Sequence, residues 1–173
     1  MDIKEKARGQ LNWLERVLHK IPGFQGYYER ELRRDSDRLQ REFIVKQLRK
    51  VKTGLNEVLQ AASRQKNFEL LQIYDLFGRS LDKSIGEIRY ADQGYSGFFD
   101  LIKIKEAELD AVYELDAKIA EMAVRFSDEF KNLAATPLEA PRLEPLRDHL
   151  DRINAMFSQR TSLLKGYEQG VSK

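Results

Sequence analysis

Apolar residues recur at intervals of three or four positions along most of the chain, and this spacing constrains the fold more than any other feature. Segments with this spacing predict helices at 2–20, 27–63, 68–91, 98–134 and 145–168. No segment alternates apolar and polar residues for long enough to predict a strand. Because short connections make successive helices antiparallel, we predict an all-α protein, an elongated up-and-down bundle of about five helices with two long helices.

The same spacing predicts which side chains form the core. On the second predicted helix the apolar residues keep heptad phase from 44 to 62, a pattern typical of coiled-coil packing. The expected core residues are Ile44, Leu48, Val51, Leu55, Val58 and Ala62, then Leu70, Tyr74, Phe77, Leu81, Ile85 and Ile88, then Ile102, Leu109, Val112, Ile119, Ala123, Phe126, Phe130 and Leu133, and finally Leu146, Leu150, Ile153, Phe157, Leu164 and Tyr167.

Segments that contain glycine, proline or a short polar run separate the predicted helices. IPGFQG (21–26) and DQGYSG (92–97) permit turn conformations, and RQKN (64–67) is typical of a tight turn between helices. Three of the four prolines lie in 135–145, which predicts a linker before the last helix. The length of 173 residues suits a single helical domain, 1–173.

Several classes of chemistry lack the residues they need. The chain has no cysteine, which excludes disulfides, thiol catalysis and cysteine-based zinc sites. Neither His19 nor His149 follows a glutamate at the Glu-x-x-His spacing of di-metal bundles. No nucleophile pattern or glycine-rich phosphate loop is present. We expect a non-enzymatic protein with no catalytic residues, no metal and no cofactor, and we identify no small-molecule substrate.

Charge is unevenly distributed along the chain. Residues 27–66 contain 11 Lys and Arg against 6 Asp and Glu, a net charge of +5, whereas residues 67–140 contain 8 against 15, a net charge of −7. The favoured interpretation places the basic second helix beside the acidic fourth helix in one monomer, and the alternative pairs them between subunits. The acidic half would repel a phosphate backbone, which argues against a nucleic-acid partner.

The apolar seam of the second helix becomes charged above residue 44. Continued in phase, this seam meets Arg41, Asp37, Arg34 and Arg30. At ~1.5 Å per residue the second helix is about 55 Å long and the third about 36 Å, so the third reaches back only to about 39–41. The GYSGFFD segment (94–100) then lies beside the charged seam, with Asp100 a partner for Arg41 or Arg34. The alternative is a charged face that is simply solvated.

Aromatic residues cluster in and beside the two glycine-containing breaks. One interpretation is that they close the end of the bundle, since aromatic rings bury large apolar areas. The other is a recognition surface, because Tyr and Arg exposed together are favoured at protein interfaces. The predicted partner-binding residues are Phe24, Tyr27, Tyr28, Arg34, Asp37, Arg41, Tyr95, Phe98, Phe99 and Asp100.

Two charged residues interrupt the apolar pattern of the last two helices. Asp116 falls within the apolar arc of the fourth helix, which predicts either a buried, paired carboxylate or a face open to solvent. Arg160 interrupts the heptads of the fifth helix, whose apolar stripe could serve the monomer core or self-association.

The first predicted helix supplies an alternative function. Its apolar stripe, which includes Trp13, Leu14 and Leu18, is flanked by basic residues, as in helices that lie in an anionic membrane interface. The alternative is that the stripe packs against the second helix. The N-terminus lacks the apolar core of a secretory signal and no segment approaches the ~18 apolar residues of a membrane span, so we expect a cytoplasmic protein, or a peripheral one at the membrane.

Two blocks of the sequence resemble a known family. IPGFQGYYERELRRDSDRLQREF (21–43) and EIRYADQGYSGFFDLIKIKEAELDAVYELD (87–116) are similar to signature blocks, IPGFxGY and GYxGFFD, of a functionally uncharacterised bacterial family of all-helical proteins. The resemblance singles out Gly23, Phe24, Tyr27, Arg34, Asp37, Arg41, Ala91, Gly94, Tyr95, Gly97, Phe98 and Asp100, and it implies no activity. We therefore expect a helical scaffold or adaptor that binds a protein partner, or a second copy of itself, through 23–41 and 91–100.

Overall fold

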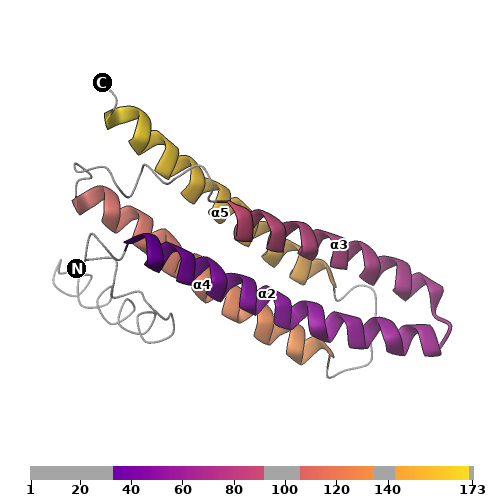
Figure 1. Ribbon diagram of the computed structural model, residues 1–173. Helices are drawn as coiled ribbons and strands as arrows, with labels where there is room; N and C mark the ends of the chain where they lie inside the picture. Colours follow the sequence, from indigo (N-terminus) through magenta and orange to yellow (C-terminus); the bar gives the residue numbers. More distant parts are fainter. Residues whose placement is uncertain (1–32, 92–105, 135–142, 172–173) are drawn as a thin grey trace, which may run out of the picture.

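The computed structural model of the protein describes residues 33–91, 106–134 and 143–171. These residues form four α-helices and no strand (Figure 1), which confirms the all-helical prediction for this part of the chain. The helices are α2 (Arg33–Arg64), α3 (Phe68–Tyr90), α4 (Glu106–Ala134) and α5 (Glu144–Val171). The predicted helix at 2–20, the predicted helix starts at 27–32 and 98–105, and most of the linker lie outside the described residues.

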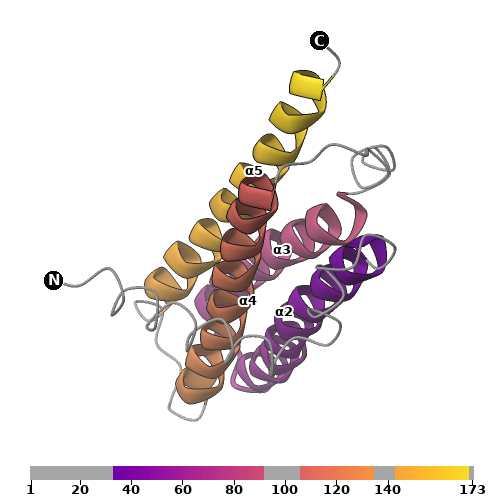
Figure 2. The same cartoon turned by 90° about the vertical axis from the view of Figure 1, so that its left-hand side faces the viewer.

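The four helices surround one apolar core. The most extensive contacts join α2 to α3, α2 to α4 and α4 to α5, whereas α3 and α5 touch at few positions. The successive pairs α2/α3 and α4/α5 are antiparallel, and α2 and α4 lie side by side and run in the same direction (Figures 1 and 2). The basic and the acidic helix are therefore neighbours within one chain, as the favoured interpretation of the charge pattern predicted.

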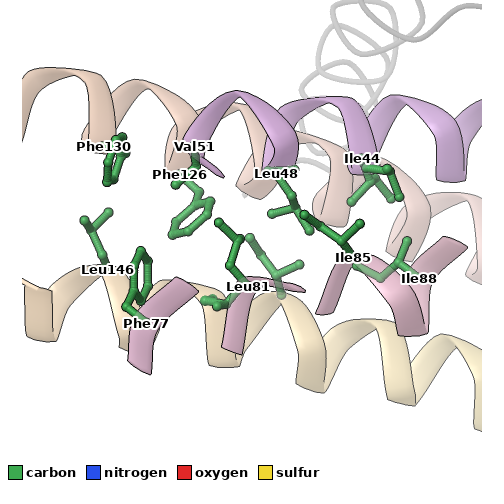
Figure 3. Packing of buried hydrophobic residues seen from close by; sticks show 14 of the residues in the cluster. Ile44, Leu48, Val51, Phe77, Leu81, Ile85, Ile88, Phe126, Phe130 and Leu146 are labelled. Atoms are coloured by element: carbon green, nitrogen blue, oxygen red, sulfur yellow. The ribbon is translucent and has the colours of Figure 1, made fainter. Parts of the chain in front are cut away.

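The core agrees with the predicted apolar spacing. Figure 3 shows side chains from α2, α3, α4 and α5 packing together, with Phe77 against Phe126 edge to face at a centroid distance of 6.3 Å. Of the predicted core residues that the structure describes, only Leu70 and Leu133 are partly exposed. Gln40 and Gln47 are also buried, and the apolar spacing does not predict them.

The turn between α2 and α3 occurs where the sequence predicted it. Lys66 adopts a left-handed conformation (φ 55°), and Asn67 donates its backbone N–H to the carbonyl oxygen of Ala62 at 3.0 Å. The Asn67 side chain accepts a hydrogen bond from the backbone N–H of Leu70 at 3.2 Å and so caps the first turn of α3. These bonds satisfy backbone groups that the two helix ends would otherwise leave without partners.

Two charged residues that interrupt the apolar pattern form a buried ion pair. Arg160 of α5 donates to both carboxylate oxygens of Asp116 on α4, from Nε to Oδ1 and from Nη2 to Oδ2 at 3.3 Å. Asp116 is 0 % exposed and Arg160 is 3 % exposed. The first of the two predictions for Asp116, a buried and paired carboxylate, is confirmed, and the Arg160 guanidinium also lies over the Phe157 ring.

Removing one member of this pair should be costly. The substitution Asp116→Ala leaves a buried guanidinium without its carboxylate, and we expect it to lower the free energy of unfolding by about 3–5 kcal/mol. The double variant D116A/R160M leaves no buried charge. Its loss of unfolding free energy should therefore be clearly smaller than the sum of the losses in the single variants D116A and R160M. Urea denaturation followed by circular dichroism measures all three, with the exposed Asp128→Ala as control, expected within about 0.5 kcal/mol of wild type. Additive losses would show that the two residues act independently.

Two helix glycines differ in the space around them. A Cβ built on Gly54 of α2 would lie 2.7 Å from Cε1 of Phe130 on α4, whereas a Cβ on Gly86 of α3 meets nothing within 4 Å. The absence of a side chain at Gly54 thus lets the Phe130 ring pack directly against the α2 backbone.

Alanine at these two positions should have opposite consequences. Both substitutions improve helix propensity by about 1 kcal/mol, so Gly86→Ala should stabilise the fold. Gly54→Ala must also displace the Phe130 ring, and overpacking of this kind costs about 1–3 kcal/mol. We expect G54A to be less stable than G86A by about that amount in urea denaturation. Equal stabilities would mean that the ring moves aside without cost.

Candidate functional site

A groove of about 600 Å³ lies between the first half of α2 and the last turn of α3. Its described lining residues are Arg38, Arg41, Glu42, Val45, Lys46, Arg49, Arg89 and Tyr90. The six residues from α2 follow one another at intervals of one or three positions, which a helix brings to a single face. The groove is therefore one continuous face of α2, bordered by the end of α3.

Arg41 holds the end of α3 against α2. Its Nη1 donates to the backbone carbonyl oxygen of Arg89 at 3.3 Å. The last carbonyls of a helix have no partner within the helix and carry partial negative charge, so an arginine at this position is favourable. The contact confirms that α3 reaches back along α2 only to about residue 41.

The groove carries a large excess of positive charge. Among its described lining residues are five Lys or Arg side chains and one carboxylate, that of Glu42. Lys46 and Arg49 are exposed and form no ion pair with any described residue. The Arg89 guanidinium lies 5.4 Å from the centroid of the Tyr90 ring, and Tyr90 is 65 % exposed. An exposed aromatic ring thus stands beside a cluster of like charges.

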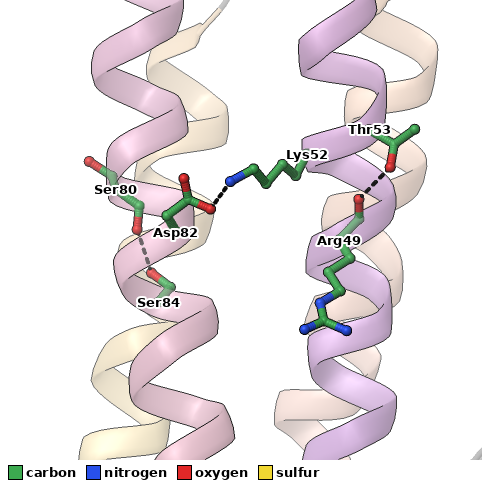
Figure 4. Close-up of polar contacts among 6 residues, drawn as sticks. All are labelled: Arg49, Lys52, Thr53, Ser80, Asp82 and Ser84. Atoms are coloured by element: carbon green, nitrogen blue, oxygen red, sulfur yellow. Dashed lines mark hydrogen bonds and ion pairs between the residues drawn. The ribbon is translucent and has the colours of Figure 1, made fainter.

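Charges farther along α2 are matched by neighbouring groups. Lys52 pairs with Asp82 of α3, and the Arg49 side chain points away from that pair (Figure 4). Lys50 donates to the side-chain oxygen of Gln47 at 2.9 Å. Neither Lys46 nor Arg49 forms an ion pair with a described side chain of α4, although α2 and α4 are neighbours. Packing beside the acidic helix therefore gives these two side chains no described carboxylate partner.

The structure describes only part of the predicted binding region. Arg41 lines the groove, and Arg34 and Asp37 lie at the start of α2, with side chains outside the described part. The other predicted residues all lie outside the described residues: Phe24, Tyr27, Tyr28, Tyr95, Phe98, Phe99 and Asp100. The proposed pairing of Asp100 with Arg41 or Arg34 lies outside them for the same reason.

Several groove residues were not among the predicted site residues. They are Arg38, Glu42, Val45, Lys46, Arg49, Arg89 and Tyr90. For the residues on α2, the sequence did contain a signal, namely the net charge of +5 in 27–66 and the helical spacing of the basic residues there. Arg89 and Tyr90 join them only through the packing of α3 on α2, which the charge pattern does not indicate.

A second pocket, of about 520 Å³, lies between α4 and α5. There Nδ1 of His149 lies 2.7 Å from Oε2 of Glu129, and the imidazole packs edge to face on Phe126 at 5.7 Å. Arg125, which also lines this pocket, pairs with Glu121 at 2.7 Å. The pocket combines basic and acidic side chains, so its charge is more nearly balanced than that of the groove.

The described residues show neither a metal-binding cluster nor a membrane-spanning helix. No group of three His, Asp or Glu side chains gathers there in a way that could hold a metal ion. None of the four described helices has the length and apolar character needed to cross a membrane.

Comparison of the chain with models of protein families, with curated proteins and with solved structures gave no match. The resemblance of 21–43 and 87–116 to an uncharacterised bacterial family remains a prediction.

Because the groove clusters like charges, reversing the charge of Arg49 should not destabilise the fold. Arg49→Glu replaces a repulsion with an attraction to the neighbouring cations, so the free energy of unfolding should stay constant or rise by about 0.2–0.5 kcal/mol. Lys52→Glu is the matched control, because it breaks the pair with Asp82 and should lower stability by about 0.2–1 kcal/mol. Urea denaturation at low salt compares the two variants. A loss in R49E as large as that in K52E would mean that Arg49 stabilises the fold.

Proposed function

We propose that the protein is a cytoplasmic, non-enzymatic helical scaffold or adaptor that binds a protein partner through 23–41 and 91–100, together with the groove between α2 and α3. The observation that supports this proposal is the excess of positive charge in the groove, in which Lys46 and Arg49 form no ion pair with a described residue. A surface patch of one charge sign attracts a partner of the opposite sign and speeds its association.

The composition of the groove favours a macromolecule. Arginine and tyrosine are the side chains most enriched in the parts of protein interfaces that dominate affinity, and the groove presents Arg38, Arg89 and an exposed Tyr90. Its length follows the axis of α2 over 38–49, about 16 Å at ~1.5 Å per residue. An elongated surface of this kind suits a polypeptide better than a compact small molecule.

The predicted helix at 2–20 carries an apolar stripe that has two possible destinations. We propose that 2–20 completes an up-and-down bundle of five helices by packing its apolar stripe on α2. The alternative is a peripheral membrane protein that inserts this stripe into an anionic membrane surface, which the positive groove would also favour.

Photo-cross-linking at Tyr90 tests the protein-binding proposal. A benzophenone amino acid at Tyr90, in the full-length chain inside the cells that express it, should give a discrete cross-linked protein, which mass spectrometry identifies. Phe68 is the matched control position, because it is an exposed aromatic residue at the opposite end of the same helix. A cross-link to a second copy of the chain would identify self-association as the interaction.

Two outcomes would overturn the proposal. The first is cross-linking that is equal at Tyr90 and Phe68, since it would show random collision. The second is the absence of a protein adduct together with co-sedimentation on anionic vesicles that is lost with high salt and with deletion of 1–20. That result would establish the membrane alternative.

A further inference from the structure

The spacing of charges in the groove indicates what kind of partner segment it holds. We infer that the groove between α2 and α3 binds an acidic stretch of polypeptide in which apolar side chains alternate with several carboxylates. This inference rests on the proposed function and specifies the chemistry of its partner.

The cations of the groove are spread along a line. Arg38 and Arg49 mark its ends on α2, about 16 Å apart at ~1.5 Å per residue, with Arg41 and Lys46 between them. A single phosphate or carboxylate contacts cations within a few ångströms of itself and would leave most of this line unused. A chain bearing several anionic groups matches it, over about five residues if extended at ~3.3 Å each, or about eleven if helical.

The groove is not uniformly charged. Val45, only 5 % exposed, contributes an apolar side chain to its lining, and the Tyr90 ring borders it. Because Val45 is almost fully buried, the exposed Tyr90 ring is the apolar surface that a polypeptide side chain can cover, whereas a polyphosphate has no apolar group to offer. Glu42 lies between Arg38 and Lys46 on the same face and opposes an anion of uniformly high density such as a nucleic-acid backbone. Spaced carboxylates with apolar residues between them avoid that repulsion.

The basic side chains can turn toward such a segment. Lys46 and Arg49 are exposed and form no ion pair with the described residues, so binding does not first have to break one of those. Arg89 is positioned over the Tyr90 ring, where its guanidinium can meet a carboxylate while the ring covers an apolar neighbour. Carboxylates in the groove would also relieve the mutual repulsion of its cations.

Fluorescence anisotropy with the full-length protein tests the inference. The probe is a fluorescein-labelled peptide of about 12 residues, three repeats of Glu-Leu-Glu-Glu, long enough to span the groove in either conformation. We expect saturable binding that weakens as salt rises from about 50 to 300 mM. A peptide with lysine in place of glutamate should not bind, and inorganic tripolyphosphate should compete poorly.

Charge reversal provides the matched comparison. The double variant K46E/R49E should bind the acidic peptide at least about tenfold more weakly than wild type, a change of about 1.4 kcal/mol. The control K131E/R147E makes the same change in net charge at exposed residues of α4 and α5, and it should bind like wild type. Circular dichroism should show equal helix content in both double variants.

The possible failures separate the inference from the proposed function. Equal weakening by both double variants, or binding of tripolyphosphate in preference to the peptide, would overturn the acidic-polypeptide inference. Absence of peptide binding alongside a protein cross-link at Tyr90 would overturn it while the proposed function stands. Peptide binding lost in K46E/R49E, together with equal cross-linking at Tyr90 and Phe68 in cells, would support the groove chemistry and overturn the proposed function.

Discussion

The ion pair between Asp116 and Arg160 fixes how α5 lies on α4, and the described fold depends on that register. Both groups are buried, so sliding either helix by one turn would leave two charges without partners in an apolar core. The contact of Glu129 with His149 fits the same alignment of the two helices. Glu129 lies thirteen residues after Asp116 on α4, and His149 lies eleven residues before Arg160 on α5, as expected for antiparallel helices. An apolar seam alone tolerates such slips because its leucines and isoleucines are nearly interchangeable. The buried charges restrict this half of the bundle to one arrangement.

The other half of the bundle carries the groove between α2 and α3. The hydrogen bond from Arg41 to the end of α3 and the Lys52–Asp82 pair farther along align the two helices, so the basic face of α2 between these contacts lies beside α3. Asp82 compensates Lys52 farther along, but no corresponding acidic side chain of α3 meets Lys46 or Arg49 among the described residues. The groove thus follows from which residues of α3 face α2, and the Arg41 hydrogen bond to the Arg89 carbonyl oxygen holds the end of α3 in place.

Much of this fold could be predicted from the sequence because helical spacing reports directly which residues face inward. The seam from Ile44 to Ala62, the turn at 64–67 and the end of α3 were all predicted. The partner of Asp116 could not be, since Asp116 and Arg160 are 44 residues apart and only the packed helices establish their register. The contribution of Arg89 and Tyr90 to the groove likewise required the position of α3 on α2. The aromatic residues of 21–28 and 94–100 lie outside the described residues, and their role stays a prediction.

The charged residues divide into two groups with different consequences. Asp116 and Arg160 were removed from water on folding, and each supplies the other's hydrogen bonds, so the pair is complete within the chain. The Lys46 and Arg49 side chains remain in water and repel one another, so an anion that lies between them would relieve this repulsion. Evolution can retain uncompensated surface charge at little cost in stability, because solvent screens it. The same screening would make an interaction built on this charge dependent on salt, whereas a contact with the exposed Tyr90 ring would persist when salt is high.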